Sequence, residues 1–237
     1  MRKHSKSLVI ALLSILLILI ASNHPNNLEI KDENYYLVHN GNTMEFSEDE
    51  IEYFKDIALG SEWNEGNNRI IKWNENPRIG IFGEPTKEDL NSLKDVIDDI
   101  NNLQNSINLS IVEEDANIEI YFVALEDFDK YVQNPMPNNW GLFYFWYDNK
   151  HFINKSIILI ATNRSTTIER SHLIREELTQ SLGLINDSWR YRNSLFYQGW
   201  TRTTEFSDLD KKLIKLLYHE GIVAGIDIEE FNKLIVK

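Results

Sequence analysis

The chain has 237 residues, of which 24 are Lys or Arg and 37 are Asp or Glu, so its formal net charge is −13. A surface this acidic repels a phosphate backbone, which excludes nucleic acid as a partner. The sequence contains no cysteine, which excludes disulfides, thiolate metal sites and a lipid-modified cysteine. The length beyond the N-terminal segment suits one hydrophobic core, so we expect a single domain over residues 43–237.

Residues 1–22 have the layout of an export signal, with Arg2, Lys3 and Lys6 before an apolar run of 14 residues at 8–21. A helix of that length spans about 21 Å, whereas the hydrocarbon core is about 30 Å thick, which favours a cleaved signal peptide. Small residues do not occupy both positions required for cleavage, which favours a retained membrane anchor. Under either alternative we expect the remainder to be extracytoplasmic, secreted or anchored to the membrane through its N-terminus.

Residues 23–42 are polar, show no apolar periodicity and are predicted to be a flexible tether. Ser47 and Glu50 then form a capping-box pattern that predicts a short helix ending at Gly60. The rest of the chain alternates between strand and helix patterns. In chain order we expect a pair of strands around 71–73 and 79–81, a helix from 86 to 103, strands at 107–112 and 118–123, a helix or loop at 128–132, strands at 141–147 and 155–162, and a helix from 166 to 183.

This order of elements predicts an α+β fold in which a twisted mixed β-sheet is backed by the long helix at 86–103. The helix at 166–183 begins with a second capping box and ends at Gly183. At about 100° per residue, Glu176 and Gln180 lie on one face of this helix, and His172 precedes them by one turn on the same side. The candidate site is therefore at the C-terminal end of this helix.

The segment E-E-L-T-Q-S-L-G-L-I-N-D at residues 176–187 resembles the metzincin signature H-E-x-x-H-x-x-G-x-x-H/D, whose histidines bind zinc and whose glutamate is the general base. By position, Glu176 and Gln180 replace the helix histidines and Asn186 replaces the third ligand. Glu177 matches the catalytic glutamate and Gly183 the turn glycine. The altered motif also resembles a family of uncharacterised bacterial exported domains.

The flanking sequence extends this resemblance over about residues 70–218. The segment A-N-I-E-I-Y-F at 116–122 is similar to a strand of matrixin-like enzymes, and residues 206–210 are similar to the start of their closing helix. The segment N-S-L-F-Y-Q-G at 193–199 is similar to the turn that places a methionine beneath the zinc, with Phe196 at the methionine position. The resemblance implies a zincin-like (metzincin-like) fold.

The metal donors implied by the resemblance are Glu176, Gln180, Asn186 and, one residue later, Asp187. Amides are weak zinc ligands, so no cofactor is the leading expectation, with zinc or another divalent cation as the alternative. Glu177 would be catalytic only in an active enzyme. The leading expectation for Glu176 and Gln180 is hydrogen bonding to each other or to strand backbone, and an unrecognised enzyme chemistry is a further alternative.

The leading functional hypothesis is an extracytoplasmic, degenerate metallopeptidase that binds a protein or peptide in its former cleft. We expect the aromatic strand at 141–147 to be a plain core strand with one packed face. The alternative is that it lines that cleft, because the resembling enzymes bind substrate as an added strand there. The runner-up function is an active metal-dependent hydrolase with an oxygen-rich site, and the third is a purely structural envelope protein.

Overall fold

The computed structural model describes residues 34–59, 68–133, 135 and 138–237. The helices and strands of this part, in chain order, are β1 (Tyr35–His39), β2 (Asn42–Phe46), α2 (Glu48–Leu59), β3 (Lys72–Trp73), β4 (Arg78–Gly83), α3 (Lys87–Leu103), β5 (Ser110–Ile111), β6 (Ile118–Val123), the 3-10 helix η1 (Leu125–Lys130), β7 (Gly141–Tyr147), β8 (Phe152–Ala161), α4 (Thr167–Gln180), α5 (Asp208–Leu217), α6 (Ile228–Leu234) and β9 (Ile235–Val236).

The main sheet has the strand order β3-β8-β6-β4-β5, and these neighbours are parallel. Strand β7 pairs with β8 in the antiparallel direction. The sheet is therefore mixed, and β7 pairs with no second strand among the described residues. Strand β6 alternates buried and half-buried residues, so one face of the sheet belongs to the main core.

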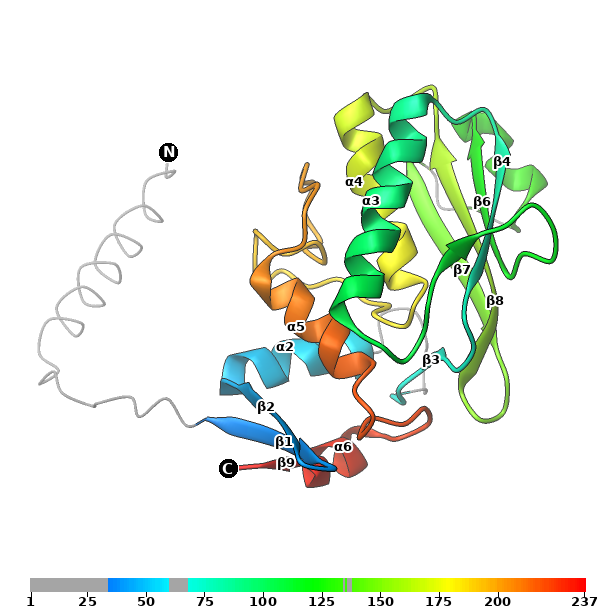
Figure 1. Ribbon diagram of the computed structural model, residues 1–237. Coiled ribbons are helices and arrows are strands. Elements are labelled where there is room, and N and C mark those ends of the chain that lie inside the picture. The colour runs from blue at the N-terminus through cyan, green and yellow to red at the C-terminus, as the bar shows by residue number, and fades with distance from the viewer. Residues whose placement is uncertain (1–33, 60–67, 134, 136–137) are drawn as a thin grey trace, which may run out of the picture. The chain divides into compact units, whose positions relative to one another are not determined.

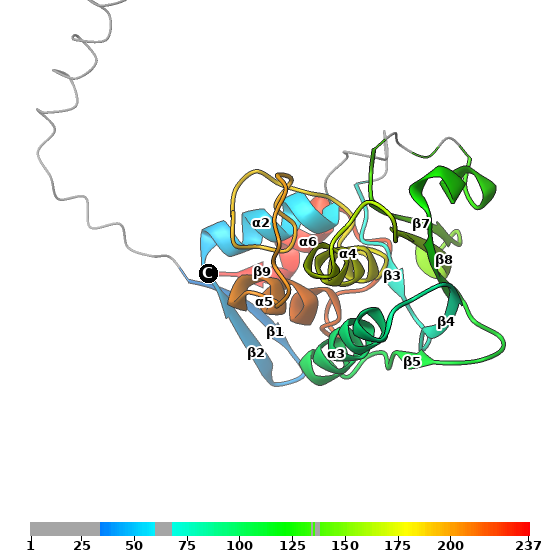
Figure 2. The ribbon, with the colours of Figure 1, turned by 90° about the horizontal axis from the view of Figure 1, so that it is seen from above.

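Helices α3 and α4 lie side by side on one face of this sheet (Figures 1 and 2). The apolar residues of α3 recur every three or four positions, so they form one buried stripe against the sheet and α4. Its buried members are Leu93, Val96, Ile97 and Ile100. The expected backing helix and the expected helix of the candidate site are thus neighbours in the core.

A second, smaller sheet includes part of the segment expected to be a flexible tether, so that expectation is wrong for residues 35–42. Strand β1 pairs with β2 and with β9 in the order β2-β1-β9. The turn between β1 and β2 is Asn40-Gly41, with φ angles of 47° and 83°. Asn and Gly tolerate positive φ, and this dipeptide is a strong signal for a two-residue hairpin. Residues 35–42 are therefore structured, while residues 1–33 of the expected signal and tether lie outside the described residues.

Two other expectations about strands are wrong. The segments around 71–73 and 79–81 do not pair with each other, because β3 adds to β8 whereas β4 lies between β5 and β6. The strand expected at 107–112 is only Ser110–Ile111. Parallel neighbours are distant in sequence, so local alternation does not reveal which strands pair.

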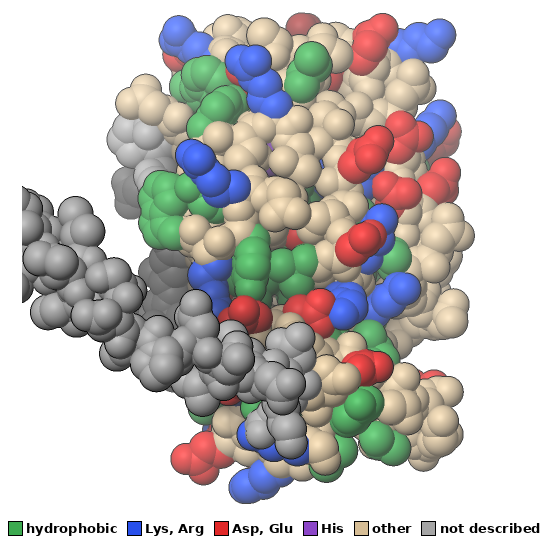
Figure 3. Space-filling view, turned by 90° about the vertical axis from the view of Figure 1, so that its left-hand side faces the viewer, with side chains coloured by type: hydrophobic (Ala, Val, Ile, Leu, Met, Phe, Trp, Pro, Cys, Tyr) green, Lys and Arg blue, Asp and Glu red, His purple; other side chains and the backbone are tan. Residues whose placement is uncertain are grey.

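The α+β fold class, with its mixed sheet, backing helix and active-site-type helix, is confirmed. Residues Glu33–Lys237 form one compact unit. On the face shown in Figure 3, acidic and basic side chains are interspersed and the hydrophobic side chains lie in separate groups. Within the described ranges, no helix has the length and hydrophobicity needed to cross a membrane.

Candidate functional site

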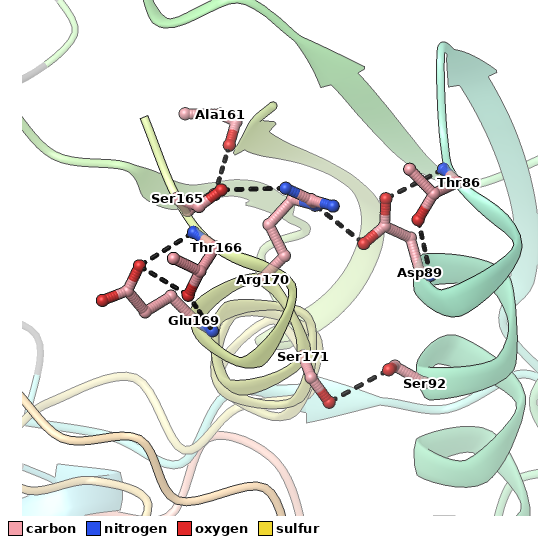
Figure 4. Close-up of polar contacts among 9 residues, drawn as sticks. All are labelled: Thr86, Asp89, Ser92, Ala161, Ser165, Thr166, Glu169, Arg170 and Ser171. Atoms are coloured by element: carbon pink, nitrogen blue, oxygen red, sulfur yellow. Dashed lines mark hydrogen bonds and ion pairs between the residues drawn. The ribbon is translucent and has the colours of Figure 1, made fainter. Parts of the chain in front are cut away.

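Helix α4 is anchored at its N-terminal end by polar contacts to α3 (Figure 4). Thr166 and Glu169 form the predicted capping box. The Arg170 Nε atom donates to Asp89 Oδ1 at 2.8 Å, and both side chains are at most 9% exposed. Asp89 also caps α3 by accepting from the Thr86 N–H. One buried ion pair therefore fixes the starts of both helices relative to each other.

The C-terminal end of α4 turns at Gly183, as predicted. Its φ angle is 120°, a conformation that favours glycine, and a Cβ atom there would lie 2.1 Å from the Ile71 carbonyl oxygen. Only glycine fits this close approach of two backbone segments. The turn brings residues 185–187 back toward the last turn of α4.

A cleft of about 510 Å³ lies between β7, the C-terminal half of α4 and the loop at 197–201. This volume is within the range of small-molecule and side-chain pockets. The rings of Phe143, Phe145 and Tyr147 follow one another along β7, with centroids 5.9 and 6.1 Å apart. All three residues line the cleft, so the aromatic strand forms a wall of the cleft as well as part of the sheet.

Glu176 faces the cleft and pairs with His172 rather than with Gln180. The distance from His172 Nε2 to Glu176 Oε2 is 3.3 Å, and His172 Nδ1 donates to the Thr203 carbonyl oxygen at 2.8 Å. Burial lowers the pKa of His172, but the hydrogen bond and charge of Glu176, together with the Thr203 carbonyl, raise it above its ordinary value. The His172 imidazole thus links α4 to the loop that closes the cleft.

Gln180 and Asp187 form the second pair in the cleft. The Gln180 Nε2 atom donates to Asp187 Oδ1 at 2.7 Å. Asn186 lies elsewhere: its Nδ2 atom donates to the Ile57 carbonyl oxygen at 3.0 Å, and it does not line the cleft. The motif position expected to supply a third donor therefore packs against α2, and the following residue, Asp187, faces Gln180.

Glu177 is the exceptional side chain of α4. It is 5% exposed and lines the cleft, and its carboxyl group makes no hydrogen bond to any other described residue. A Cβ atom on Gly141 of β7 would lie 2.6 Å from Glu177 Oε1, so any other residue there would force the carboxyl group to move. Burial, followed by the charges of Glu176 and Asp187, raises the pKa of Glu177 well above its ordinary value.

The donors of this cleft do not fit a zinc site. Zinc prefers imidazole or thiolate ligands, and His172 uses both ring nitrogens for Glu176 and Thr203. Gln180 directs its amide nitrogen to Asp187, and Asn186 is turned away. Over the described ranges, no group of three or more His, Asp or Glu side chains is arranged to hold a metal ion. The expected hydrogen bond between Glu176 and Gln180 is also replaced, by pairs with His172 and Asp187.

Phe196, at the position expected for the methionine turn, is fully buried in the turn before the closing loop. Its carbonyl oxygen accepts from the Ser188 N–H, and its own N–H donates to Ser194 Oγ. Ser194 Oγ also bonds to Asp210 at 2.6 Å, which caps α5. This network positions the next residue, Tyr197, in the wall of the cleft.

Sequence reasoning missed two contributors to the cleft. Trp200 lies in the closing loop, is 56% exposed and has its ring 5.1 Å from Trp140 and 6.3 Å from His172. Gly141 provides the space for Glu177. A glycine at the start of a strand rich in aromatic residues was the available signal, since glycine in a strand often marks a close approach by another group.

A family model described as "Protein of unknown function (DUF2927)" matches residues 47–237. Comparison with curated proteins gives no match. The structure described as "Crystal structure of myroilysin" is 13% identical, with a TM-score of 0.43 and coverage of 63% of this chain and 86% of that chain. A second, "Structure of Myroilysin", is 13% identical, with a TM-score of 0.41 and coverage of 63% and 82%. Both comparisons describe a distant structural similarity.

Proposed function

The chain belongs to the family described as "Protein of unknown function (DUF2927)", and we propose that it is an extracytoplasmic peptide-binding module built on a degenerate metallopeptidase-like scaffold. The observation that carries this proposal is the cleft of about 510 Å³ beside an edge strand with one unpaired side in the described part of the chain. Location outside the cytoplasm is proposed from the export-signal layout of residues 1–22.

The backbone of β7 supports peptide binding by strand addition. The Trp140 carbonyl accepts from the Ala161 N–H, and the Tyr144 carbonyl accepts from Ser156 Oγ, so these two residues direct their backbone toward β8. Residues alternate along an antiparallel ladder. Phe143 and Phe145 therefore direct their N–H and C=O groups away from β8, where an extended peptide can pair with them.

The spacing of the aromatic rings supports the same mode of binding. Alternate side chains of an extended peptide are about 6.8 Å apart. The ring centroids of Phe143, Phe145 and Tyr147 are 5.9 and 6.1 Å apart along β7. A peptide added to β7 would place every second side chain over this row of rings.

A binding module, rather than a zinc peptidase, accounts for the polar groups of the cleft. Glu177 occupies the position of the general base, but it has no zinc-bound water to activate if imidazole donors are missing. The remaining carboxyl and amide groups provide shape and hydrogen bonds, which binding requires. The alternative of an active metal-dependent hydrolase differs in one respect that can be measured, namely turnover.

The test uses the full-length chain and a library of labelled hexapeptides. The tightest binder is then resynthesised with a methyl group on one backbone nitrogen at a time. Strand addition predicts loss of affinity at every second position, because only those N–H groups face β7. Uniform effects, or no bound hexapeptide, would contradict the proposal.

Hydrolysis of the same peptides is followed with and without added zinc, manganese or calcium. The proposal predicts intact peptides in all mixtures. Turnover that disappears in the Glu177→Gln variant would establish the hydrolase in place of the binding module.

A further inference from the structure

We propose that the end of the cleft formed by Glu176, Glu177 and Asp187 receives a cationic side chain, Lys or Arg, of the bound peptide. This inference rests on the proposed peptide-binding function and specifies the class of peptide. It is carried by the charge of the cleft, by the missing partner of Glu177 and by the aromatic wall beside both.

The cleft is acidic over its described lining. Three carboxyl groups, those of Glu176, Glu177 and Asp187, line it, and its described lining contains no Lys or Arg. His172 offsets part of the charge of Glu176 at 3.3 Å, and Gln180 gives Asp187 a neutral hydrogen bond. A cationic ligand would therefore lower the electrostatic energy of the cleft, whereas an anionic ligand would raise it.

Glu177 indicates where the cation is expected. Buried polar groups in folded proteins are almost always hydrogen-bonded, and exceptions mark functional positions. The other buried polar side chains of α4 each make at least one hydrogen bond, although Arg175 Nε has no partner among the described residues; those bonds include Arg170 to Asp89, Arg175 to Asp99 and Thr179 to the Arg175 carbonyl. Glu177 alone among them has no hydrogen bond within the described chain, although its carboxyl group lines the cleft. An ammonium or guanidinium group supplies the missing donors.

The aromatic side chains at the mouth suit the same ligand. Trp200 is 56% exposed and lies with its ring 6.3 Å from that of His172, and Tyr197 lines the same side of the cleft. Aromatic faces attract cations, and they also pack against the apolar stem of Lys or Arg. The cleft thus provides carboxyl groups for the charged end and rings for the stem.

A proton should leave the cleft when the cation enters. The pKa of Glu177 is raised by burial and by Glu176 and Asp187, and a nearby positive charge lowers the pKa of a carboxyl group. Above the ordinary carboxyl range, binding of a cationic peptide is therefore accompanied by release of a proton, whereas binding of a neutral peptide is not.

The experiment compares four versions of one hexapeptide that binds the full-length chain, with Lys, Arg, norleucine or Glu at each position in turn. Norleucine keeps the stem of Lys without its charge. We expect one position at which Lys and Arg bind at least tenfold more tightly than norleucine and Glu binds weakest. Calorimetry in two buffers of different ionisation enthalpy should show proton release for Lys but not for norleucine.

The variants Glu176→Gln and Asp187→Asn should reduce the preference for Lys over norleucine severalfold, with thermal melting used to verify folding. Asp95→Asn is the matched control, because Asp95 is an exposed acidic residue of α3 that does not line this cleft; it should leave the preference unchanged. Equal reduction by the control would show a general charge effect and overturn the inference.

Two other outcomes are distinguishable. If Lys and norleucine peptides bind equally well at every position, the cationic pocket is wrong while peptide binding stands. If no peptide binds but n-butylamine does, a small amine is the ligand, and both the cationic peptide and the proposed function are overturned.

Discussion

The two halves of helix α4 differ in whether their buried polar side chains are paired. In the N-terminal half, Glu169 caps the helix and Arg170 pairs with Asp89, so the charges are matched. In the C-terminal half, Glu176 and Glu177 gather with Asp187 beside a cleft, and Glu177 has no hydrogen bond among the described residues. A buried charge that has an oppositely charged partner holds the helices in place. A buried carboxyl group without a hydrogen-bond partner lowers stability and creates a place for a ligand.

The largest expected loss of stability follows from a change in the N-terminal half of α4, where the charges are paired. The Arg170→Ala variant leaves the Asp89 carboxylate buried without its cation, so we expect a loss of about 3 to 5 kcal/mol in the free energy of unfolding. Urea denaturation measures this loss. The control is Arg164→Ala, which breaks an exposed pair with Glu126 and should cost less than about 1 kcal/mol. Equal losses in the two variants would mean that the buried pair is not the anchor of α4.

A second large effect is expected at the turn after the cleft. Gly183→Ala adds a Cβ atom in a backbone conformation that favours glycine and against the Ile71 carbonyl oxygen. We expect a loss of about 2 to 3 kcal/mol, measured by thermal or urea unfolding. Gly41→Ala is a useful comparison, because Gly41 also has positive φ but no atom within 4 Å of the added Cβ. If Gly41→Ala costs as much, the backbone conformation accounts for the whole effect and the close approach to Ile71 does not matter.

Replacing Glu177 should stabilise the protein, whereas the two changes above destabilise it. The pKa of Glu177 is raised above its ordinary value of 4.5 in the folded protein. Its contribution to stability is therefore present below that value and is lost as pH rises toward the folded pKa. Glu177→Gln removes this loss, so the variant should gain about 1 to 2 kcal/mol over wild type by about pH 8 and almost nothing near pH 4.5. Parallel unfolding curves for the two proteins across this pH range would contradict the unmatched burial of Glu177.

The smallest expected effect concerns His172. Burial lowers its pKa, but the hydrogen bond and charge of Glu176 together with the Thr203 carbonyl raise it above the ordinary 6.5 in the folded protein. The stabilising contribution is fully present below pH 6.5 and is lost as pH rises through the folded pKa. Wild type should therefore lose about 1 kcal/mol relative to His172→Asn over this interval, measured by urea unfolding at several pH values. A difference that does not change with pH would mean that the pKa of His172 is not raised in the folded protein.

Much of this architecture could be predicted from local sequence. The capping patterns at Thr166 and Thr86 place the starts of two helices, and Gly183 marks the end of α4, because these are interactions between residues a few positions apart. The hairpin turn at Asn40-Gly41 has an equally local signal in this dipeptide, and the prediction of a tether over residues 23–42 overlooks it.

The rest depends on contacts between distant residues. The separation of β3 from β4 in the sheet follows from parallel pairing and not from their own sequences. The motif comparison predicts Asn186 as a site residue, but the turn after Gly183 directs Asn186 to Ile57 and brings Asp187 to Gln180. The position of the Glu177 carboxyl group depends in the same way on Gly141, which is 36 positions earlier in the chain (177 − 141).

The most direct test of the account is amide hydrogen exchange, resolved residue by residue by NMR, on the full-length chain with and without a bound hexapeptide. The account predicts new protection at the outward-facing N–H groups of Phe143 and Phe145, and little change at Leu142 and Tyr144, which face β8. Protection that instead appears in the cavity between α3, α4 and α5, around Asp99 and Phe206, would contradict the assignment of the cleft beside β7 as the binding site.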